Sequence, residues 1–283
     1  MKLCTFTHNG NTSYGIQTDE GIVDLAPHFA GRGVTDLKGL LEAQLINECA
    51  EIVQSTVNAI PLGEIEYEPV IPNPGKILCV GVNYHAHRLE TGRPETTYPM
   101  LFTRYPESQV GHKRPMLRPR ETERLDYEGE MAVIIGKEGR RISREDALSY
   151  VAGYACYNDG SVRNFQRHTS QFLPGKTFVG TGAFGPYMVT SDEIPDPRKL
   201  HLQTRLNGKV MQDVDTDLMI NSIPQIIEYI STAVPLKIGD VIVSGTPGGV
   251  GDKRTPPVYL WAGDTVEVEI SGIGTLSNTI EDE

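Results

Sequence analysis

The sequence has little of what marks disulfide-rich, membrane-spanning or exported proteins. No apolar run approaches the roughly 18 to 20 residues of a membrane span, and the opening residues, MKLCTFTHNG, lack the apolar core of a targeting signal. The chain has four cysteines in 283 residues, without C-x-x-C spacing, which excludes a disulfide scaffold and a structural zinc site. We therefore expect a cytoplasmic protein in which these cysteines stay reduced: Cys4, Cys49, Cys79 and Cys156.

Positive charge is also scarce. The chain carries 26 Lys and Arg against 37 Asp and Glu, a formal net charge of -11. Such a field repels polyphosphate and anionic membrane surfaces, so we expect neither nucleic acid nor a membrane as a partner. A small anionic substrate is compatible with this charge, because a bound divalent cation or a local Arg/Lys pair outweighs a diffuse field at short range.

The order of apolar and turn residues divides the chain into two units. Residues 1–70 predict a small α+β domain, in which short strands precede one helix. In that helix, apolar residues within 37–53 recur at three- and four-residue steps, after the candidate caps Thr35 and Asp36. The stretch 66–76 contains three prolines and no helical period, which indicates a linker. The predicted strands of this unit are 2–7, 13–17 and 22–24.

Residues 71–283 predict a larger domain in which strands outnumber helices. We predict one helix at 147–152, behind a near capping box at 143–146, and another after Ser222, where isoleucines repeat on one face. In the last strand every second residue is apolar, as in a half-buried strand. The unit is thus mixed α+β and β-rich rather than a βαβ array. Its predicted strands are 76–82, 130–136, 184–190, 202–208, 240–245 and 264–270.

Two glutamates, Glu128 and Glu130, stand at the start of an apolar strand in LDYEGEMAVIIGK. The two-residue period of a strand points both carboxylates to one face, where they repel each other unless a cation lies between them. The pair suggests a hard divalent metal with oxygen ligands, Mg²⁺, Mn²⁺ or Ca²⁺. Asp159, after a second apolar stretch and ahead of Arg163, is the candidate third ligand. A solvated face or an ion-pair partner is the alternative explanation.

A histidine and a glutamate lie three residues apart in GVNYHAHRLETGRP, directly after the apolar strand ILCVG. On one helical turn Glu90 can hold the imidazole of His87, fix its tautomer and raise its basicity, as a general base for water requires. The alternatives are a surface His–Glu pair and metal binding by His85 and His87 together. The carboxylate-rich surroundings favour an oxygen-ligated ion over zinc.

Two further loops carry candidate groups. SGTPGGVGDK follows the strand DVIVSG, and its backbone amides and Thr246 are candidates for holding an anionic group. It is not a P-loop, because Asp252 separates Gly251 from Lys253, and a plain tight connection is the alternative. Lys176 lies in the Gly/Pro-framed segment FLPGKTFVGTGAFGP, where the alternative is a solvated loop lysine.

Taken together and in this order, the motifs resemble the fumarylacetoacetate hydrolase family. They are GVNYHAHRLE, LDYEGEMAVIIGK, YNDGSVRNFQ, GKTF before FGPYMVT, and LNGKVMQD with GDVIVSGTPGGVG, and they span roughly 72–270. The resemblance implies a catalytic domain built as a rolled, mixed β-sheet over 71–283, with a small accessory domain before it. It also implies a homodimer and a divalent metal, Mg²⁺ or Mn²⁺, held by three carboxylates.

The resemblance assigns roles residue by residue. The chain departs from the family pattern at Arg104, where many members have lysine, and at Val179, where aspartate is common. We expect these departures to affect substrate choice rather than the metal site. The positions that match the metal ligands are Glu128, Glu130 and Asp159, and those that match catalytic groups are His87, Glu90 and Lys176. The predicted substrate-binding residues are Asn83, Tyr84, Arg104, Arg163 and Thr246.

The implied activity is metal-dependent hydrolysis of a C–C bond in a β-diketo acid, which is acylpyruvate-like, fumarylacetoacetate-like or sugar-derived. The 2-oxo acid end would chelate to the metal, His87 with Glu90 would deprotonate water, and Lys176 would stabilise the oxyanion. The alternatives on the same scaffold are decarboxylation of a 2-oxo acid such as oxaloacetate and keto–enol isomerisation or hydration. A non-catalytic, metal-stabilised binding domain would need the base to be missing, whereas the whole constellation is present.

Overall fold

The computed structural model describes residues 1–55 and 58–283, and within them β-strands form most of the framework. The largest sheet has eleven strands in the order β3-β2-β1-β13-β11-β10-β16-β5-β6, with β4 beside β1 and β7 beside β13. Both parallel and antiparallel pairs occur in it, which confirms the predicted mixed, β-rich architecture. Its strands are β1 (Lys2–His8), β2 (Asn11–Gln17), β3 (Ile22–Asp24), β4 (Ile65–Tyr67), β5 (Ile77–Gly81), β6 (Met100–Arg104), β7 (Gln109–Val110), β10 (Gly129–Ile135), β11 (Val151–Asp159), β13 (Gly182–Thr190) and β16 (Val241–Val243).

A second sheet packs against one face of the first. It has five strands in the order β15-β14-β17-β18-β8, and a two-stranded sheet of β12 and β9 lies beside the site described below. In β17 the alternate residues Val266, Val268 and Ile270 are buried, as the period-two pattern predicted. The strands are β8 (Met116–Arg118), β9 (Leu125–Asp126), β12 (Ser161–Val162), β14 (His201–Leu206), β15 (Lys209–Asp215), β17 (Thr265–Ile270) and β18 (Gly274–Asp282).

The helices are short and lie around the sheets. None of them, among the described residues, is long and apolar enough to cross a bilayer. Helix α7 begins behind Ser222, whose predicted capping role is confirmed by a reciprocal box with Gln225. The helices are α1 (Ala26–Phe29), α2 (Leu37–Glu42), α3 (Ile46–Ser55), α4 (His85–Thr91), α5 (Arg163–Gln166), α6 (Leu173–Lys176) and α7 (Ile223–Ala233).

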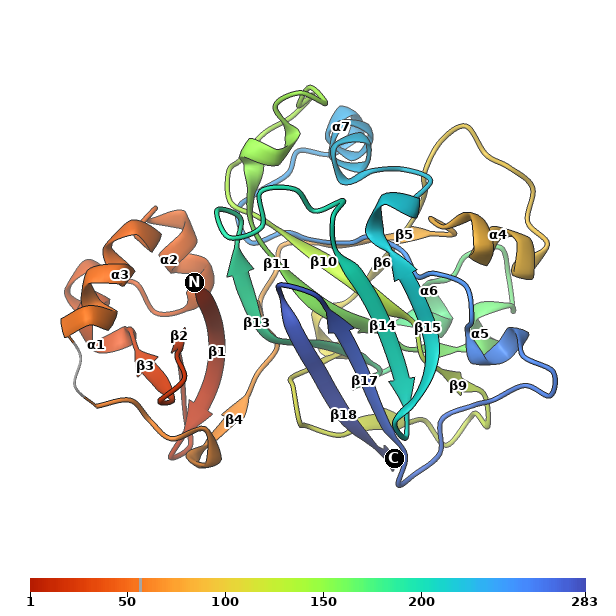
Figure 1. Cartoon of the computed structure of the whole chain (residues 1–283), viewed down its shortest axis with the longest axis horizontal. Helices are drawn as coiled ribbons and strands as arrows, with labels where there is room; N and C mark the ends of the chain where they lie inside the picture. The colour runs from red at the N-terminus through yellow and green to blue at the C-terminus, as the bar shows by residue number, and fades with distance from the viewer. Residues whose placement is uncertain (56–57) are drawn as a thin grey trace.

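The N-terminal unit joins the main sheet through β1, whose Leu3 is opposite Met188 of β13. Figure 1 shows this unit, in red and orange, at one end of the molecule beside β13. Strands of both predicted units therefore belong to one sheet, joined where β1 pairs with β13. The domain boundary at residue 70 stays a prediction. No sequence signal pointed to this pairing, because it joins residues more than 180 positions apart.

The single helix predicted within 37–53 is wrong in one respect, since the chain forms two helices, α2 and α3. Asp36 caps α2 by accepting the backbone N–H of Gly39 at 2.7 Å, as predicted. Gln44 then adopts a left-handed conformation, φ 57°, and Leu45 donates its N–H to the carbonyl of Leu40, which ends the first helix. Apolar spacing alone does not reveal such a break, because the apolar residues of both helices pack into the same core cluster.

The helix predicted at 147–152 is also wrong. Ser143 and Asp146 do form a local hydrogen-bonded turn, with the two side chains 2.8 Å apart. Only a short 3₁₀ turn follows, over Ala147–Tyr150, and strand β11 starts at Val151. Pairing of this segment with β10 and β13 supplies its backbone hydrogen bonds, so tertiary contacts outweigh the local start signal.

Strand β10 lies in the middle of the protein and is buried on both faces. Met131, Val133 and Ile135 belong to the core shared with the five-stranded sheet, whereas Ala132 and Ile134 belong to the core on the opposite face. This explains the continuous apolar run after the two glutamates. The position of β10 places the start of the strand, with its acidic residues, deep in the molecule.

Candidate metal and active site

Antiparallel pairing brings the three predicted metal ligands together. The start of β10 lies against the end of β11, and the N–H of Asp159 donates to the carbonyl oxygen of Glu128 at 2.8 Å. Ligand atoms of Glu128, Glu130 and Asp159 all lie within 4.8 Å of one another, and all three side chains are buried. In the described part of the chain, no other group of His, Cys, Asp or Glu side chains is close enough to hold an ion. We call these three residues the acidic triad.

Two members of the triad are paired with buried cations. Lys176 Nζ lies 2.5 Å from both Glu128 Oε2 and Asp159 Oδ2, and Arg163 lies 2.6 Å from Glu128 Oε1. Burial alone would raise the pKa of Glu128, but Lys176 and Arg163 outweigh it and lower that pKa to about 2. Arg104 pairs with Asp159 Oδ1 at 2.6 Å. Lys176, the predicted catalytic lysine, thus forms ion pairs with two members of the triad.

Glu130 is the exception, because its partner is a backbone group. Its Oε2 accepts the N–H of Gly245 at 2.5 Å. Burial raises the pKa of Glu130 well above its usual value, and the negative charges of Asp159 and Glu128 raise it further. The buried cluster around the triad has four carboxylates, including Asp126, but three cations. A divalent ion would supply the missing positive charge, so the donor set fits an oxygen-ligated divalent metal.

The predicted catalytic dyad is formed on α4. His87 Nδ1 lies 2.7 Å from Glu90 Oε1, which leaves Nε2 as the nitrogen that can exchange a proton with a bound molecule. Glu90 Oε2 in turn accepts the N–H of Gly249 at 2.9 Å, so the carboxylate is held at both oxygens. His85 is exposed on the same helix. The alternative of an HxH metal pair therefore finds no further ligands among the described residues.

Four backbone amides of the glycine-rich loop after β16 bind the protein's own carboxylates. Gly245 donates to Glu130, and Gly249 donates to Glu90. Gly251 and Asp252 both donate their N–H groups to Asp126, each at 2.9 Å. These four amides are therefore not available to an external anion, and anion binding by the rest of the loop stays a prediction. One loop instead sets the positions of a triad member, the base-orienting glutamate and a buried aspartate.

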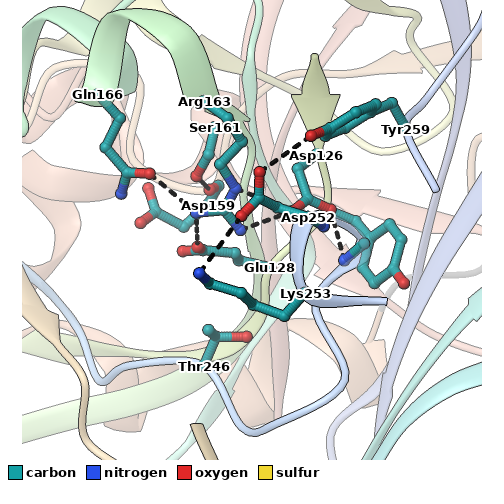
Figure 2. Close-up of polar contacts among 12 residues, drawn as sticks. Asp126, Glu128, Asp159, Ser161, Arg163, Gln166, Thr246, Asp252, Lys253 and Tyr259 are labelled. Carbon is teal, nitrogen blue, oxygen red and sulfur yellow. Dashed lines mark hydrogen bonds and ion pairs between the residues drawn. The ribbon is translucent and has the colours of Figure 1, made fainter. Parts of the chain in front are cut away.

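Asp126 is a site residue that sequence reasoning missed. Its Oδ2 accepts a hydrogen bond from Arg163 Nε at 2.8 Å and forms an ion pair with Arg163 Nη2 at 2.7 Å, and Arg163 reaches from there to Glu128 (Figure 2). Asp126 thereby orients Arg163 toward the triad. The signal was present, because Asp126 precedes Glu128 by the same two residues that separate Glu128 from Glu130.

A cavity of about 280 Å³ connects the triad and the dyad. His87, Glu128, Glu130 and Lys176 line it, together with the predicted substrate-binding residues Arg163 and Thr246. The hydroxyl of Thr246 donates to the carbonyl of Gly129 at 3.0 Å and accepts from Gln212, so both interactions belong to the framework. A cavity of this size suits a small acid rather than an extended chain.

Three predicted substrate-binding residues lie outside the cavity wall. Asn83 donates to the carbonyls of Asn221 and Ser244 and so joins the loop before α4 to the glycine-rich loop. Tyr84 is 1% exposed at the start of α4. Arg104 is fully enclosed, where it binds Asp159, Ser108 and Thr181. These three side chains are buried beside the site and do not line its cavity. Asn83 and Arg104 make hydrogen bonds to the surrounding protein, and Tyr84 packs in the interior.

Comparison with known proteins points to one family. The family model described as fumarylacetoacetate (FAA) hydrolase C-terminal matches residues 76–281. An oxaloacetate tautomerase of Bacillus subtilis is 44% identical over 225 residues, which cover 77% of this chain and 74% of the relative. A fumarylacetoacetate hydrolase structure from Exiguobacterium antarcticum is 35% identical, with a TM-score of 0.80 and full coverage of both chains. A maleylpyruvate hydrolase from Sphingobium, solved with manganese and pyruvate, is 26% identical, with a TM-score of 0.82 over 100% of this chain and 99% of that one.

Proposed function

Because this chain belongs to the fumarylacetoacetate hydrolase family, we propose that it is a divalent-metal-dependent keto–enol tautomerase of a short 2-oxo acid of the oxaloacetate class. The observation that carries the proposal is that His87, held by Glu90, lines the same small cavity as Glu128 and Glu130 of the triad. Tautomerisation needs one group that moves a proton between carbon and oxygen, and the cavity offers such a group. The 44% identical relative named as an oxaloacetate tautomerase supports this assignment over the C–C hydrolysis expected from the sequence.

The triad would hold the ion through Glu128, Glu130 and Asp159. A divalent ion there would coordinate the 2-oxo acid and stabilise negative charge on its oxo oxygen. His87 Nε2 would take the proton from C3, and the electrons of that C–H bond would form the C2=C3 double bond. The same nitrogen would then give the proton to the oxygen on C2, which completes the enol.

The other residues of the site orient this transfer. Glu90 holds His87 Nδ1 and so fixes the ring in the orientation that presents Nε2 to the cavity. Lys176 stays protonated, because the attraction of Asp159 and Glu128 raises its pKa despite burial. It therefore serves as a fixed positive charge beside the substrate and not as a base.

Stopped-flow spectroscopy of enol-oxaloacetate with Mg²⁺- or Mn²⁺-loaded protein tests the proposal. We expect fast loss of enol absorbance without release of CO₂ or pyruvate, and loss of the activity on treatment with chelator. His87→Asn should lower kcat by about a hundredfold or more. His85→Gln, on the exposed side of the same helix, is the matched control and should keep full activity.

The second candidate is the hydrolase, since the same dyad could deprotonate water and the maleylpyruvate hydrolase structure contains manganese and pyruvate. Acylpyruvates assayed with the same preparation separate the two. Release of pyruvate and an acid, with enol-oxaloacetate left at its uncatalysed rate, would replace the tautomerase by the hydrolase. Release of CO₂ from oxaloacetate would instead identify a decarboxylase.

A further inference from the structure

Of the cationic side chains that line the cavity, Arg93 differs from the rest in having no acidic partner. Arg163 and Lys176 are paired with the triad, and Arg167 is paired with Asp252. Lys253 also faces Asp252, at 3.9 Å. In the part of the chain that the structure describes, no carboxylate forms an ion pair with Arg93. Its charge is therefore available to a bound anion.

The position of Arg93 is set by the helix that carries the dyad. Helix α4 ends at Thr91 and is capped by Gly92, which has a left-handed conformation with φ 67°, and Arg93 donates its N–H back to the carbonyl of Arg88 at 3.2 Å. The guanidinium then lies 5.0 Å from the ring centre of Phe172, a cation–π distance. Phe172 in turn contacts Phe102 edge to face, at 5.7 Å between ring centres.

Phe102 links this end of the cavity to the triad, because Lys176 Nζ lies 5.1 Å from its ring centre. The cavity thus has a charged inner end at the triad and a second cation, Arg93, placed over an aromatic wall. A 2-oxo acid that uses its C1 carboxylate and oxo group at the triad would extend its remaining carbons along this wall.

We propose that Arg93 binds the second carboxylate of a 2-oxo dicarboxylic acid and thereby selects dicarboxylates over monocarboxylates. This inference rests on the proposed function, since it takes the triad as the place where the 2-oxo acid end binds. A guanidinium pairs with a carboxylate through two parallel hydrogen bonds, which adds directional selectivity to charge. The neighbouring Arg167 cannot take this role without giving up Asp252.

Isothermal titration of the Mn²⁺-loaded protein with malate and with pyruvate tests the inference. Both ligands offer oxygens to the ion, but only malate has a distal carboxylate. We expect Arg93→Met, which keeps an unbranched stem over Phe172, to weaken malate binding by about tenfold and to leave pyruvate binding within about twofold. Arg93→Lys should recover part of the loss. Arg140→Met, an exposed site at the opposite end of β10, controls for the change in net charge.

Equal weakening of malate and pyruvate by Arg93→Met, or no change in either, would overturn the role of Arg93. So would a wild-type protein that binds malate no better than pyruvate. The proposed function has a separate readout, the turnover of enol-oxaloacetate. A protein that binds malate through Arg93 but does not accelerate tautomerisation would overturn the tautomerase and keep the dicarboxylate site.

Discussion

Two buried regions of this chain treat ionisable groups in opposite ways. At the triad, the buried carboxylates Glu128 and Asp159 are paired with Lys176, Arg163 and Arg104, each within 2.6 Å. His112, which contacts Tyr67 of β4 and Ser277 of β18, is 9% exposed and stays neutral, because burial, helped by the charge of Lys113, lowers its pKa to about 4. Buried carboxylates at the candidate active site are thus paired with cations, whereas the buried histidine in the packed region is neutral.

The neutral region is held by directional contacts instead of ion pairs. His112 Nδ1 accepts the N–H of Ser277 at 3.0 Å, and its ring meets Tyr67 edge to face with centres 5.0 Å apart. Arg114 faces the same side but pairs with Glu68 at 2.9 Å and, at 3.4 Å, with Glu66. The acidic groups near His112 are thus engaged by an arginine and do not stabilise an imidazolium.

The largest expected effect comes from removing a buried cation. Arg104→Met removes the cation at Asp159 Oδ1, leaving only Lys176 at Oδ2, and also removes the hydrogen bonds of Arg104 to Ser108 and Thr181. It should destabilise the metal-free protein by about 3–5 kcal/mol. Urea unfolding in the presence of chelator measures this. Arg144→Met is the control, because its pair with Glu228 is largely exposed and should contribute less than about 1 kcal/mol. Equal losses in the two variants would show that burial does not govern these pairs.

Local patterns in the sequence were sufficient to predict much of the fold, but not the buried ion pairs at the triad. The capping residues Asp36 and Ser222 and the alternation in β17 depend on neighbours within a few positions, and all three were predicted. The contact between Arg104 and Asp159 joins residues 55 positions apart, and no local spacing encodes it. Arg104 was therefore predicted to bind substrate, whereas the structure buries it behind the triad.

In the candidate site, too, local spacings were predictable from the sequence and long-range contacts were not. The same-face spacing of Glu128 and Glu130 and the one-turn spacing of His87 and Glu90 follow from backbone periods, and the structure shows both arrangements. The amides of the glycine-rich loop were candidates for holding an external anion, and composition does not reveal which acceptors the fold brings to four of them. Three carboxylates from distant segments accept those amides.

A smaller effect is expected from acid. The unfolded chain protonates His112 near pH 6.5, whereas the folded protein does so only near pH 4, so protons favour the unfolded state between these values. The contribution of His112 is full above pH 6.5 and falls by up to about 3 kcal/mol as the pH drops to about 4.

Urea unfolding at a series of pH values, compared with His112→Asn, isolates this contribution. Asparagine keeps an acceptor for Ser277 but does not titrate, so the variant should lose less stability than the wild type over the same range. Parallel pH profiles for the two proteins would mean that His112 is protonated in the folded state and that the region is not neutral.

The smallest effect on stability is expected at the member of the triad that has no cation. Glu130→Gln replaces a buried carboxyl group whose pKa is raised well above its usual value, and the amide oxygen can still accept the N–H of Gly245. The metal-free variant should therefore match the wild type within about 1 kcal/mol or exceed it. Its affinity for Mn²⁺ should nevertheless fall by about a hundredfold, because one of three charged ligands is lost.

Glu128→Gln is the matched comparison two residues away on the same face. It breaks the contacts with Lys176 and Arg163, so it should lose both Mn²⁺ affinity and metal-free stability. Calorimetric titration with Mn²⁺ and urea unfolding in chelator measure the two quantities separately. If Glu130→Gln destabilised the metal-free protein as much as Glu128→Gln, Glu130 would already have a cation partner in the protein. The divalent ion would then not be the charge that the triad requires.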